Sequence, residues 1–376
     1  MTNASENGAA PAASYWDYIR VDDLLALQGG LESDEAPLDN EEVLFITVHQ
    51  VFELWFKLVL RELVVARDLF IAPHVAEQEL SGAARGVRRA TAIFRVAAHH
   101  FEVVETLGTR EFLAFRNKLM PASGFQSAQM RRIEILLGLD EAERIQMGGE
   151  ASHLETLRNQ DGSKSSAYKA VEDQLADRPT LKGAIEAWLL RAPIDGVPHD
   201  APDAEAQLGK FIDRYLESHA GEVDASLERA LELAPGDAAK ERLKTMYRRE
   251  LESVRGYLKP SEEEGGARRA RIRAAVLFID TYRELPLLAW PREVLAALIE
   301  LEQAFLIFRQ RHARMVERVI GRRPGTGGSA GVDYLDKTAL EYRVFRDLWA
   351  TRTILVRPEA APKLDNERYY GFRTEA

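Results

Sequence analysis

Helical periodicity constrains the fold of this chain more than any other feature of its sequence. Between residues 41 and 65 apolar side chains recur with the 3.6-residue period of an α-helix, and no Gly or Pro interrupts them. The apolar arc is so wide that this helix is expected to be buried on most sides. Similar patterns cover about 76–106, 109–120, 126–137, 181–191, 204–233, 237–257, 268–282, 291–320 and 338–349. With no convincing alternating strand beside them, these patterns predict an all-α fold.

Breakers and polar stretches separate the predicted helices without dividing the chain into domains. Gly and Pro fall where helices are expected to end, at 121–124, 193–196 and 265–266, and Pro291 is expected to open the next helix. The polar stretches 145–180 and 193–203 are interpreted as surface connections. We expect a disordered tail over residues 1–14, one helical domain over 15–355 and an irregular tail over 356–376.

Composition excludes several classes of protein. The formal net charge of −10 argues against binding to a nucleic-acid backbone, which needs a basic face. The absence of cysteine excludes disulfides, thiolate nucleophiles, zinc–thiolate sites, iron–sulfur clusters and thiolate-ligated haem. The first 14 residues lack the features of a secretory signal, and no run approaches the roughly 18 apolar residues that span a membrane. A cytoplasmic protein is therefore expected.

The eight histidines are the natural candidates for metal binding or catalysis in a chain without cysteine. His49 lies inside the aromatic-rich helix, where an imidazole needs a partner or a cavity; a core histidine bonded to a neighbouring helix is the alternative. His99 and His100 are adjacent and lack the i,i+4 spacing of a helical metal pair. Four others lie in loops or polar segments and are interpreted as exposed: His74, His153, His199 and His219.

His312 lies late in the helix predicted over 291–320. A neutral imidazole among apolar side chains and arginines suits a haem, because the iron takes the nitrogen, apolar groups cover the porphyrin and arginines pair with propionates. A lone histidine on a helix is more often structural, so both interpretations stay open. The apolar side chains that share its general face are Phe305, Phe308, Met315 and Val319.

A glycine-rich segment follows at 325–331, with four glycines in seven residues. The Gly-Lys-Ser/Thr of a phosphate-binding loop is absent, and no strand precedes it as a dinucleotide site requires. Residues 327–331 match Gly-x-Ser-x-Gly, but a serine hydrolase of that type needs a strand before the serine and a histidine after it, and His312 is the last histidine. The segment is either a mobile loop whose amides and Thr326 hydroxyl close over a small polar ligand, or a flexible connection.

Several segments, in the same order along the chain, carry a family resemblance. They are 15–19, 44–57 (LFITVHQVFELWFK), 115–116 with 121–127, 187–193 and 311–335. Together they resemble the tryptophan 2,3-dioxygenases of the haem dioxygenase superfamily. The resemblance implies a bundle-like all-α fold, a buried b-type haem and a homotetramer. It also implies a reaction in which O2 cleaves the indole C2–C3 bond of L-tryptophan to give N-formylkynurenine.

The resemblance implies a role for each matching residue. His312 would be the proximal ligand of the haem iron, with Phe101 and Ser123 beside the haem. His49 would lie on the distal side and hydrogen-bond the indole N–H, and Arg116 would pair with the substrate carboxylate. The other implied substrate contacts are Phe45, Phe112, Leu119 and Thr326, together with Tyr15, Tyr18 and Ile19 from a neighbouring subunit.

Four positions depart from the family pattern and would reshape the pocket. Phe112 replaces a tyrosine whose hydroxyl helps hold the carboxylate, Val48 a glutamine, Phe101 a tryptophan and Ala330 a serine. Relatives of the superfamily oxygenate modified tryptophans or other aromatics, some of them as monooxygenases, and this is the alternative function. A non-catalytic haem or gas sensor is the second alternative.

Overall fold

The computed structural model describes residues 14–32, 34–119, 127–139, 144, 154–324 and 331–371, and the regular structure in these ranges is helical. The α-helices are α1 (Tyr15–Tyr18), α2 (Val21–Leu25), α3 (Asn40–Ile71), α4 (Glu77–Val104), α5 (Thr109–Phe115), α6 (Ala128–Leu137), α7 (Ser166–Ala176), α8 (Leu181–Leu190), α9 (Ala204–Leu233), α10 (Asp237–Leu258), α11 (Gly266–Thr281), α12 (Ala289–Ile320), α13 (Val332–Glu341) and α14 (Arg346–Ile354). Short 3-10 turns lie at η1 (Arg116–Leu119), η4 (Glu155–Leu157), η5 (Glu262–Glu264), η6 (Pro286–Leu288), η7 (Pro358–Ala360) and η8 (Glu367–Tyr370). The prediction of an all-α fold is confirmed.

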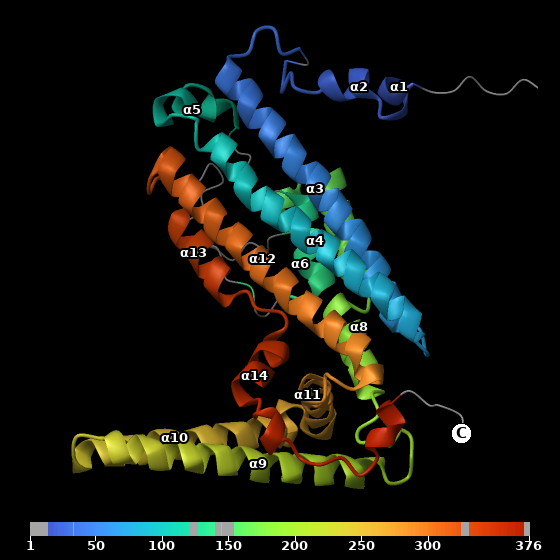
Figure 1. The fold of residues 1–376 in the computed structure, drawn as a ribbon. Coiled ribbons are helices and arrows are strands. Elements are labelled where there is room, and N and C mark those ends of the chain that lie inside the picture. Colours follow the sequence, from blue (N-terminus) through green and yellow to red (C-terminus); the bar gives the residue numbers. More distant parts are fainter. Residues whose placement is uncertain are drawn as a thin grey trace, which may run out of the picture.

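Three long helices, α3, α4 and α12, form the centre of the molecule and run side by side (Figure 1). α3 begins after Asp39, and Glu41 and Glu42 in its first turn interact favourably with the positive end of the helix dipole. It ends at Ile71, just before Ala72, whose helical conformation is disfavoured by the following Pro73. The helix predicted from residue 41 is thus six residues longer than its apolar pattern at the C-terminal end.

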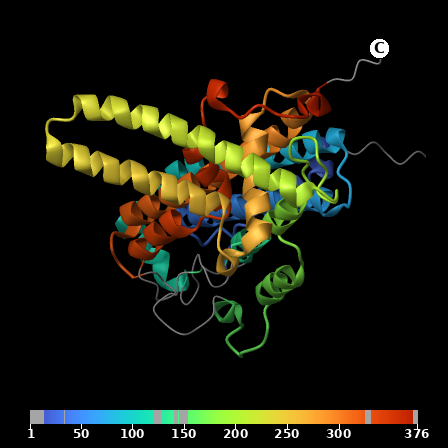
Figure 2. The same cartoon turned by 90° about the horizontal axis from the view of Figure 1, so that it is seen from below.

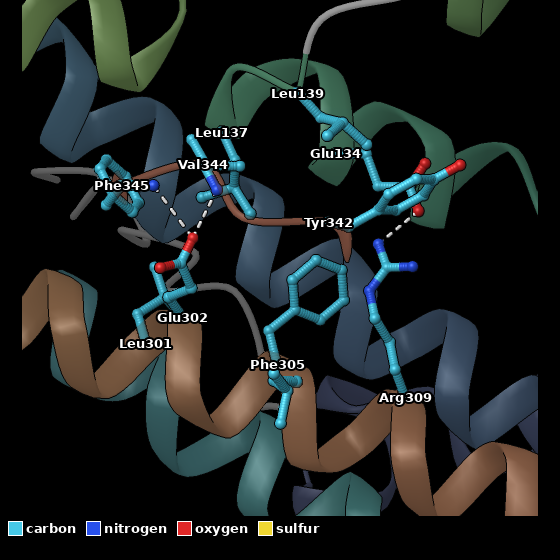
Figure 3. A pocket seen from close by; sticks show the side chains of 11 residues that line it. Glu134, Leu137, Leu139, Leu301, Glu302, Phe305, Arg309, Tyr342, Val344 and Phe345 are labelled. Atoms are coloured by element: carbon cyan, nitrogen blue, oxygen red, sulfur yellow. Dashed lines mark hydrogen bonds and ion pairs between the residues drawn. The ribbon is translucent and has the colours of Figure 1, made fainter. Parts of the chain in front are cut away.

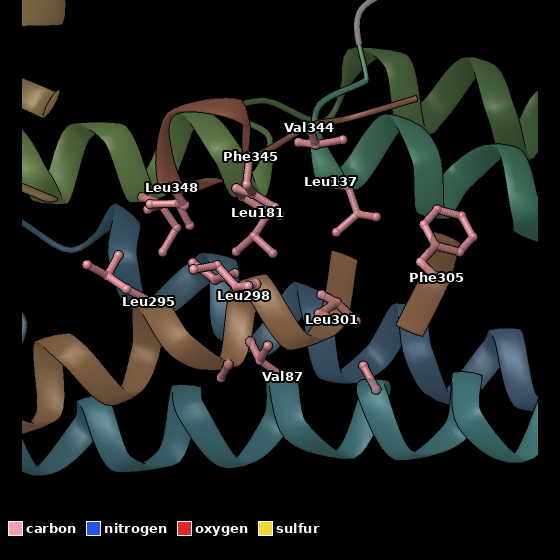
Figure 4. Close-up of a cluster of buried hydrophobic side chains, with 14 of the residues drawn as sticks. Val87, Leu137, Leu181, Leu295, Leu298, Leu301, Phe305, Val344, Phe345 and Leu348 are labelled. Carbon is pink, nitrogen blue, oxygen red and sulfur yellow. The ribbon is translucent and has the colours of Figure 1, made fainter. Parts of the chain in front are cut away.

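The apolar core lies where α12 packs against α4 and α14, and side chains from α6 and α8 point toward the same region (Figure 4). Leu295, Leu298 and Leu301 of α12 point into it and are almost completely buried. Burying one such side chain stabilises the fold by about 1.5–3 kcal/mol. The labelled partners from the other elements are Val87, Leu137, Leu181, Val344, Phe345 and Leu348.

α6 is short but has well-defined ends, which matters because it walls the site described below. The Ser127 hydroxyl accepts a hydrogen bond from the Met130 amide and caps its first turn. Gly138 ends it with φ of 113°, and a Cβ at that position would lie 2.8 Å from the Cβ of Lys182. Both the backbone conformation and the close packing therefore require glycine there.

α9 and α10 form a helical hairpin that projects from the body, as Figure 2 shows. Between Leu355 and residue 371, where the described part of the chain ends, the regular structure consists of short 3-10 turns, yet this segment is anchored to the body. Tyr370 is buried, donates a hydrogen bond to the Pro193 carbonyl and accepts one from the Gly196 amide. The buried carboxylate of Asp195 accepts the backbone amides of Asp365 and Asn366.

Two helix predictions are wrong. The single helix expected over 338–349 is broken between α13 and α14, because the carboxylate of Glu302, buried on α12, accepts the amides of Val344 at 2.5 Å and Phe345 at 3.0 Å (Figure 3). These donors are satisfied by a tertiary contact instead of by the next helical turn. The polar stretch 145–180 contains α7, which Ser165 caps and whose Tyr168 and Val171 pack in a small separate cluster.

α3 is, within the described ranges, a helix long and apolar enough to cross a membrane by length and composition alone. It packs against α4, α6 and α8 instead, and carries Glu53 and His49 toward an internal cavity. Only 28% of its most apolar stretch is buried, and Leu54, Leu58 and Val65 are exposed, so the expectation that this helix is buried on most sides is wrong for the single chain.

Candidate active site

A cavity of about 510 Å³ lies between α3, α4, α5, α6, α12 and α13. Most of its wall is aromatic or aliphatic, with a small number of polar groups, as is typical of a ligand site. The residues that it brings together include seven of those predicted from the sequence: Phe45, His49, Phe101, Phe112, Arg116, Leu119 and His312.

One face of α3 supplies much of this wall. Phe45, His49 and Glu53 are spaced by four residues and therefore lie above one another on the helix. Phe52 and Phe56 flank them, while Val59 and Leu63 continue the helix into the core. The wide apolar arc seen in the sequence thus serves both the core and the cavity.

The tautomer of His49 follows from its hydrogen bond. Its Nδ1 lies 2.7 Å from the carbonyl oxygen of Phe45, one turn earlier on α3. A carbonyl only accepts, so in the neutral ring Nδ1 carries the proton and Nε2 is left as an acceptor. Burial lowers the pKa of His49, outweighing the Phe45 hydrogen bond and the field of Glu53 that raise it. The accessible part of the ring lines the cavity, so His49 presents a neutral acceptor to it.

His312 enters the cavity from α12. Burial, with repulsion from His49 and Arg309, lowers the pKa of His312 to about 4, so its imidazole is neutral at pH 7. The ring of Phe101 stacks on it at a centroid distance of 5.4 Å and an interplanar angle of 11°. In the described part of the chain no group hydrogen-bonds to its ring nitrogens. A neutral imidazole with an available nitrogen is the form that binds a metal ion.

Aromatic rings connect the two histidines. Phe52 lies 6.3 Å from the His49 ring, 4.8 Å from Phe101 and 6.0 Å from Phe308, centroid to centroid. Phe52 was not in the predicted site, and Phe308 was named only as one of the apolar side chains that share the face of His312. Their spacing of three and four residues from His49 and His312 is the signal that puts them on the same helix faces. They give the cavity a broad apolar surface.

Arg116 lies in η1 at the α5 end of the cavity. Its Nη2 donates to the Pro324 carbonyl at 2.6 Å, and its Nε is buried without a partner. Among the described residues no carboxylate pairs with it, so its charge is available to an anionic ligand. Phe45, Phe112 and Phe115 form an aromatic cluster beside it, with centroids 5.4–5.9 Å apart.

The wall next to α6 is held by a buried charge cluster that no sequence motif indicated. The Glu134 carboxylate accepts from Arg131 and Arg144 at 2.7 Å and from Arg309 at 2.6 Å. Burial alone would raise its pKa, but the three guanidiniums hold the pKa of Glu134 well below its usual range. Figure 3 shows Arg309 reaching from α12 toward Glu134, beside the rings of Phe305 and Tyr342.

The remaining predicted residues lie elsewhere. Ser123 and Thr326 are outside the described residues. Tyr15, Tyr18 and Ile19 lie on or next to α1; Tyr15 is 76% and Tyr18 82% exposed, and none of the three lines this chain's own cavity.

Three of the four histidines expected to be exposed are described. His74 and His199 are exposed, while His153 is outside the described residues. For His219 the prediction is wrong, because it is buried on α9. Burial lowers the pKa of His219, and the negative charge of Glu250 on the adjacent α10 partly offsets this. The polar sequence neighbours of His219 hid its burial, because this burial comes from the elements that pack against α9, among them α10.

Comparison with known proteins identifies the family. The family described as tryptophan 2,3-dioxygenase matches residues 2–355. A tryptophan 2,3-dioxygenase of Sorangium cellulosum is 51% identical over 367 residues, covering 96% of this chain and 88% of the relative. Tryptophan 2,3-dioxygenase 2 of Ralstonia nicotianae is 49% identical over 368 residues, covering 96% and 98%. A tryptophan 2,3-dioxygenase-like protein of Xanthomonas campestris pv. campestris is 48% identical over 274 residues, 71% of this chain and 98% of the relative. The chain belongs to the tryptophan 2,3-dioxygenase family.

Proposed function

We propose that this enzyme is a haem-dependent dioxygenase that inserts both atoms of O2 across the indole C2–C3 bond of L-tryptophan, giving N-formylkynurenine. The observation that carries the proposal is the set of groups in one apolar cavity. Three groups match the three parts of the proposed ligand set. The neutral acceptor His49 matches an indole N–H, and the available imidazole of His312 matches an iron. Arg116, whose guanidinium has no carboxylate partner among the described residues, matches an amino-acid carboxylate.

The residues present fit a b-type haem. Within the described ranges no three His, Asp or Glu side chains form a group that could hold a metal ion, so an iron bound by His312 would take its other ligands from a porphyrin. Phe52, Phe101 and Phe308 supply the apolar surface that a porphyrin requires. Cysteine is absent, so the haem would not be attached through thioethers. When bound, haem would supply the binding and activation of O2.

The side chains of this enzyme bind and orient the substrate. Nε2 of His49 would accept the indole N–H and so fix the rotation of the ring in the cavity. His49 would position the ring without removing its proton, since an indole nitrogen is too weak an acid to transfer the proton readily. Arg116 would take the carboxylate, and Phe45, Phe112 and Leu119 would enclose the apolar part of the substrate and exclude water. Ser123 next to the haem and Thr326 at the substrate's ammonium and carboxylate remain part of this proposal.

The decisive experiment is product analysis with labelled oxygen. Purified, haem-loaded, reduced protein is mixed with L-tryptophan and ¹⁸O2, and the product is identified by mass spectrometry. We expect a product that carries two labelled oxygen atoms. One labelled atom would instead indicate a monooxygenase, and haem-loaded protein that forms no product would contradict the proposal and favour a sensor.

We also propose that the enzyme is a homotetramer in which α1 completes the cavity of a neighbouring copy. The support is the exposure of Tyr15, Trp16, Tyr18 and Ile19, because α1 and α2 bury no residue against their own chain. Monomeric proteins rarely leave such clusters of apolar side chains in water. Light scattering measures the mass in solution, and a monomer mass would refute the homotetramer. In a monomer, deleting residues 1–20 should leave the affinity for L-tryptophan unchanged. A cytoplasmic location stays a prediction, to be checked by cell fractionation.

A further inference from the structure

Two carboxylates bracket the substrate-facing residues of α3. Glu42, Phe45, His49 and Glu53 follow one another at intervals of three or four residues and so share one face of the helix. Phe45 and His49 face the cavity, and each carboxylate binds a different neighbouring segment.

Glu42 binds the turn that carries Arg116. It is buried in the first turn of α3, and its Oε2 accepts a hydrogen bond from Lys118 Nζ at 2.8 Å. Lys118 follows Arg116 by two residues in η1. A charge-assisted contact at this point fixes the turn relative to α3.

Glu53 binds the first turn of α6. Its Oε1 accepts from the Ser127 hydroxyl at 2.6 Å and its Oε2 from Gln129 Nε2 at 2.9 Å, and Gln129 Nε2 also reaches the Glu53 carbonyl at 2.7 Å. The negative charge lies at the N-terminal end of α6, where the helix dipole favours it. Ser127 and Met130, which line the cavity, are thereby held against α3 beside His49.

We propose that Glu42 and Glu53 are positioning residues that set the two ends of the substrate site against α3. Glu42 acts through Lys118 and sets Arg116 for the substrate carboxylate. Glu53 acts through Ser127 and Gln129 and sets the α6 wall that confines the indole near His49. This inference rests on the proposed function, because it assumes an indole amino acid as the ligand.

The test compares two ligands that differ only in the carboxylate. L-Tryptophan and tryptamine are titrated into haem-loaded protein, and Kd is read from the haem absorption spectrum. Glu42→Ala should raise the Kd of L-tryptophan about tenfold, the effect of a displaced charge-assisted contact, and that of tryptamine less than about twofold. Glu53→Ala should raise both by similar factors, since the wall meets the shared indole. Glu53→Gln should raise both by a smaller factor than Glu53→Ala, because its amide oxygen can still accept from Ser127 and Gln129 keeps its hydrogen bond to the backbone carbonyl of residue 53.

Glu62→Ala is the matched control, since it removes a carboxylate from the same helix that pairs with Arg89 and does not line the cavity. If Glu42→Ala fails to fold, Lys118→Met breaks the same contact from its more exposed side. Equal effects of Glu42→Ala on both ligands, or affinities like those of the control, would overturn the assignment. Failure of wild-type protein to distinguish L-tryptophan from tryptamine would contradict the proposed function itself.

Discussion

Replacing Arg116 by leucine isolates the contribution of the cavity's guanidinium to substrate binding. Arg116 has no carboxylate partner in the described part of the chain, so the substitution leaves no anion among the described residues unpaired. A carboxylate held by hydrogen bonds to a charged group gains about 1.5–3 kcal/mol. Losing the upper value corresponds to a Kd for L-tryptophan about a hundredfold weaker.

The same substitution should change the stability of the protein little. The folded chain loses one hydrogen bond, from Nη2 to the Pro324 carbonyl, while the buried Nε has no partner to lose. We expect the free energy of unfolding to fall by about 1 kcal/mol. Denaturant unfolding of the wild type and the variant, both without haem, measures this difference.

Binding is assayed by titrating L-tryptophan and tryptamine into the haem-loaded variant. Arg318→Leu is the control, because Arg318 also donates to a backbone carbonyl, that of Glu105, but lies outside the cavity. Tryptamine affinity should be unchanged within about twofold, since it has no carboxylate to lose. Wild-type affinity for L-tryptophan in Arg116→Leu would refute the assignment and favour a haem sensor that has no use for this residue.

Three further predictions concern the wall, the iron ligand and the pocket. Glu134→Leu removes the carboxylate shared by three guanidiniums and should destabilise the fold by about 3–5 kcal/mol, seen as a lower Tm that Glu62→Leu does not reproduce. The haem-free protein should lose stability as the pH falls from about 6.5 toward about 4, because the unfolded chain takes up a proton at His312 that the folded chain excludes. The His312→Ala variant should lose less stability over the same pH range. After haem is added, this variant should not give the Soret band of a histidine-ligated haem. Phe112→Tyr adds a hydroxyl at the carboxylate end of the cavity. One added hydrogen bond of about 1 kcal/mol should lower the KM for L-tryptophan several-fold. An unchanged KM would show that the hydroxyl does not reach the substrate carboxylate.

Local patterns predicted the helices well where their own apolar faces meet the core. The periodicity over 291–320 and 204–233 corresponds closely to α12 and α9, because each helix buries a continuous stripe of its own residues. The failures have a tertiary cause. The break between α13 and α14 depends on Glu302 of α12, and the burial of His219 depends on the elements that pack against α9, among them α10, and neither cause is local in sequence.

The sequence by itself determined the helical class of the fold and the residues able to do chemistry. Without cysteine, histidine was the natural candidate for a metal ligand, and the helical spacing put Phe45, His49 and Glu53 on one face of α3. Only the tertiary structure decided that His312, from a helix more than 200 residues later, faces the same cavity, and that Arg116 has no carboxylate partner among the described residues. The reason is physical: the direction of a side chain follows from the local helix, whereas its burial, its protonation state and its unused hydrogen-bonding capacity depend on which other helices pack around it.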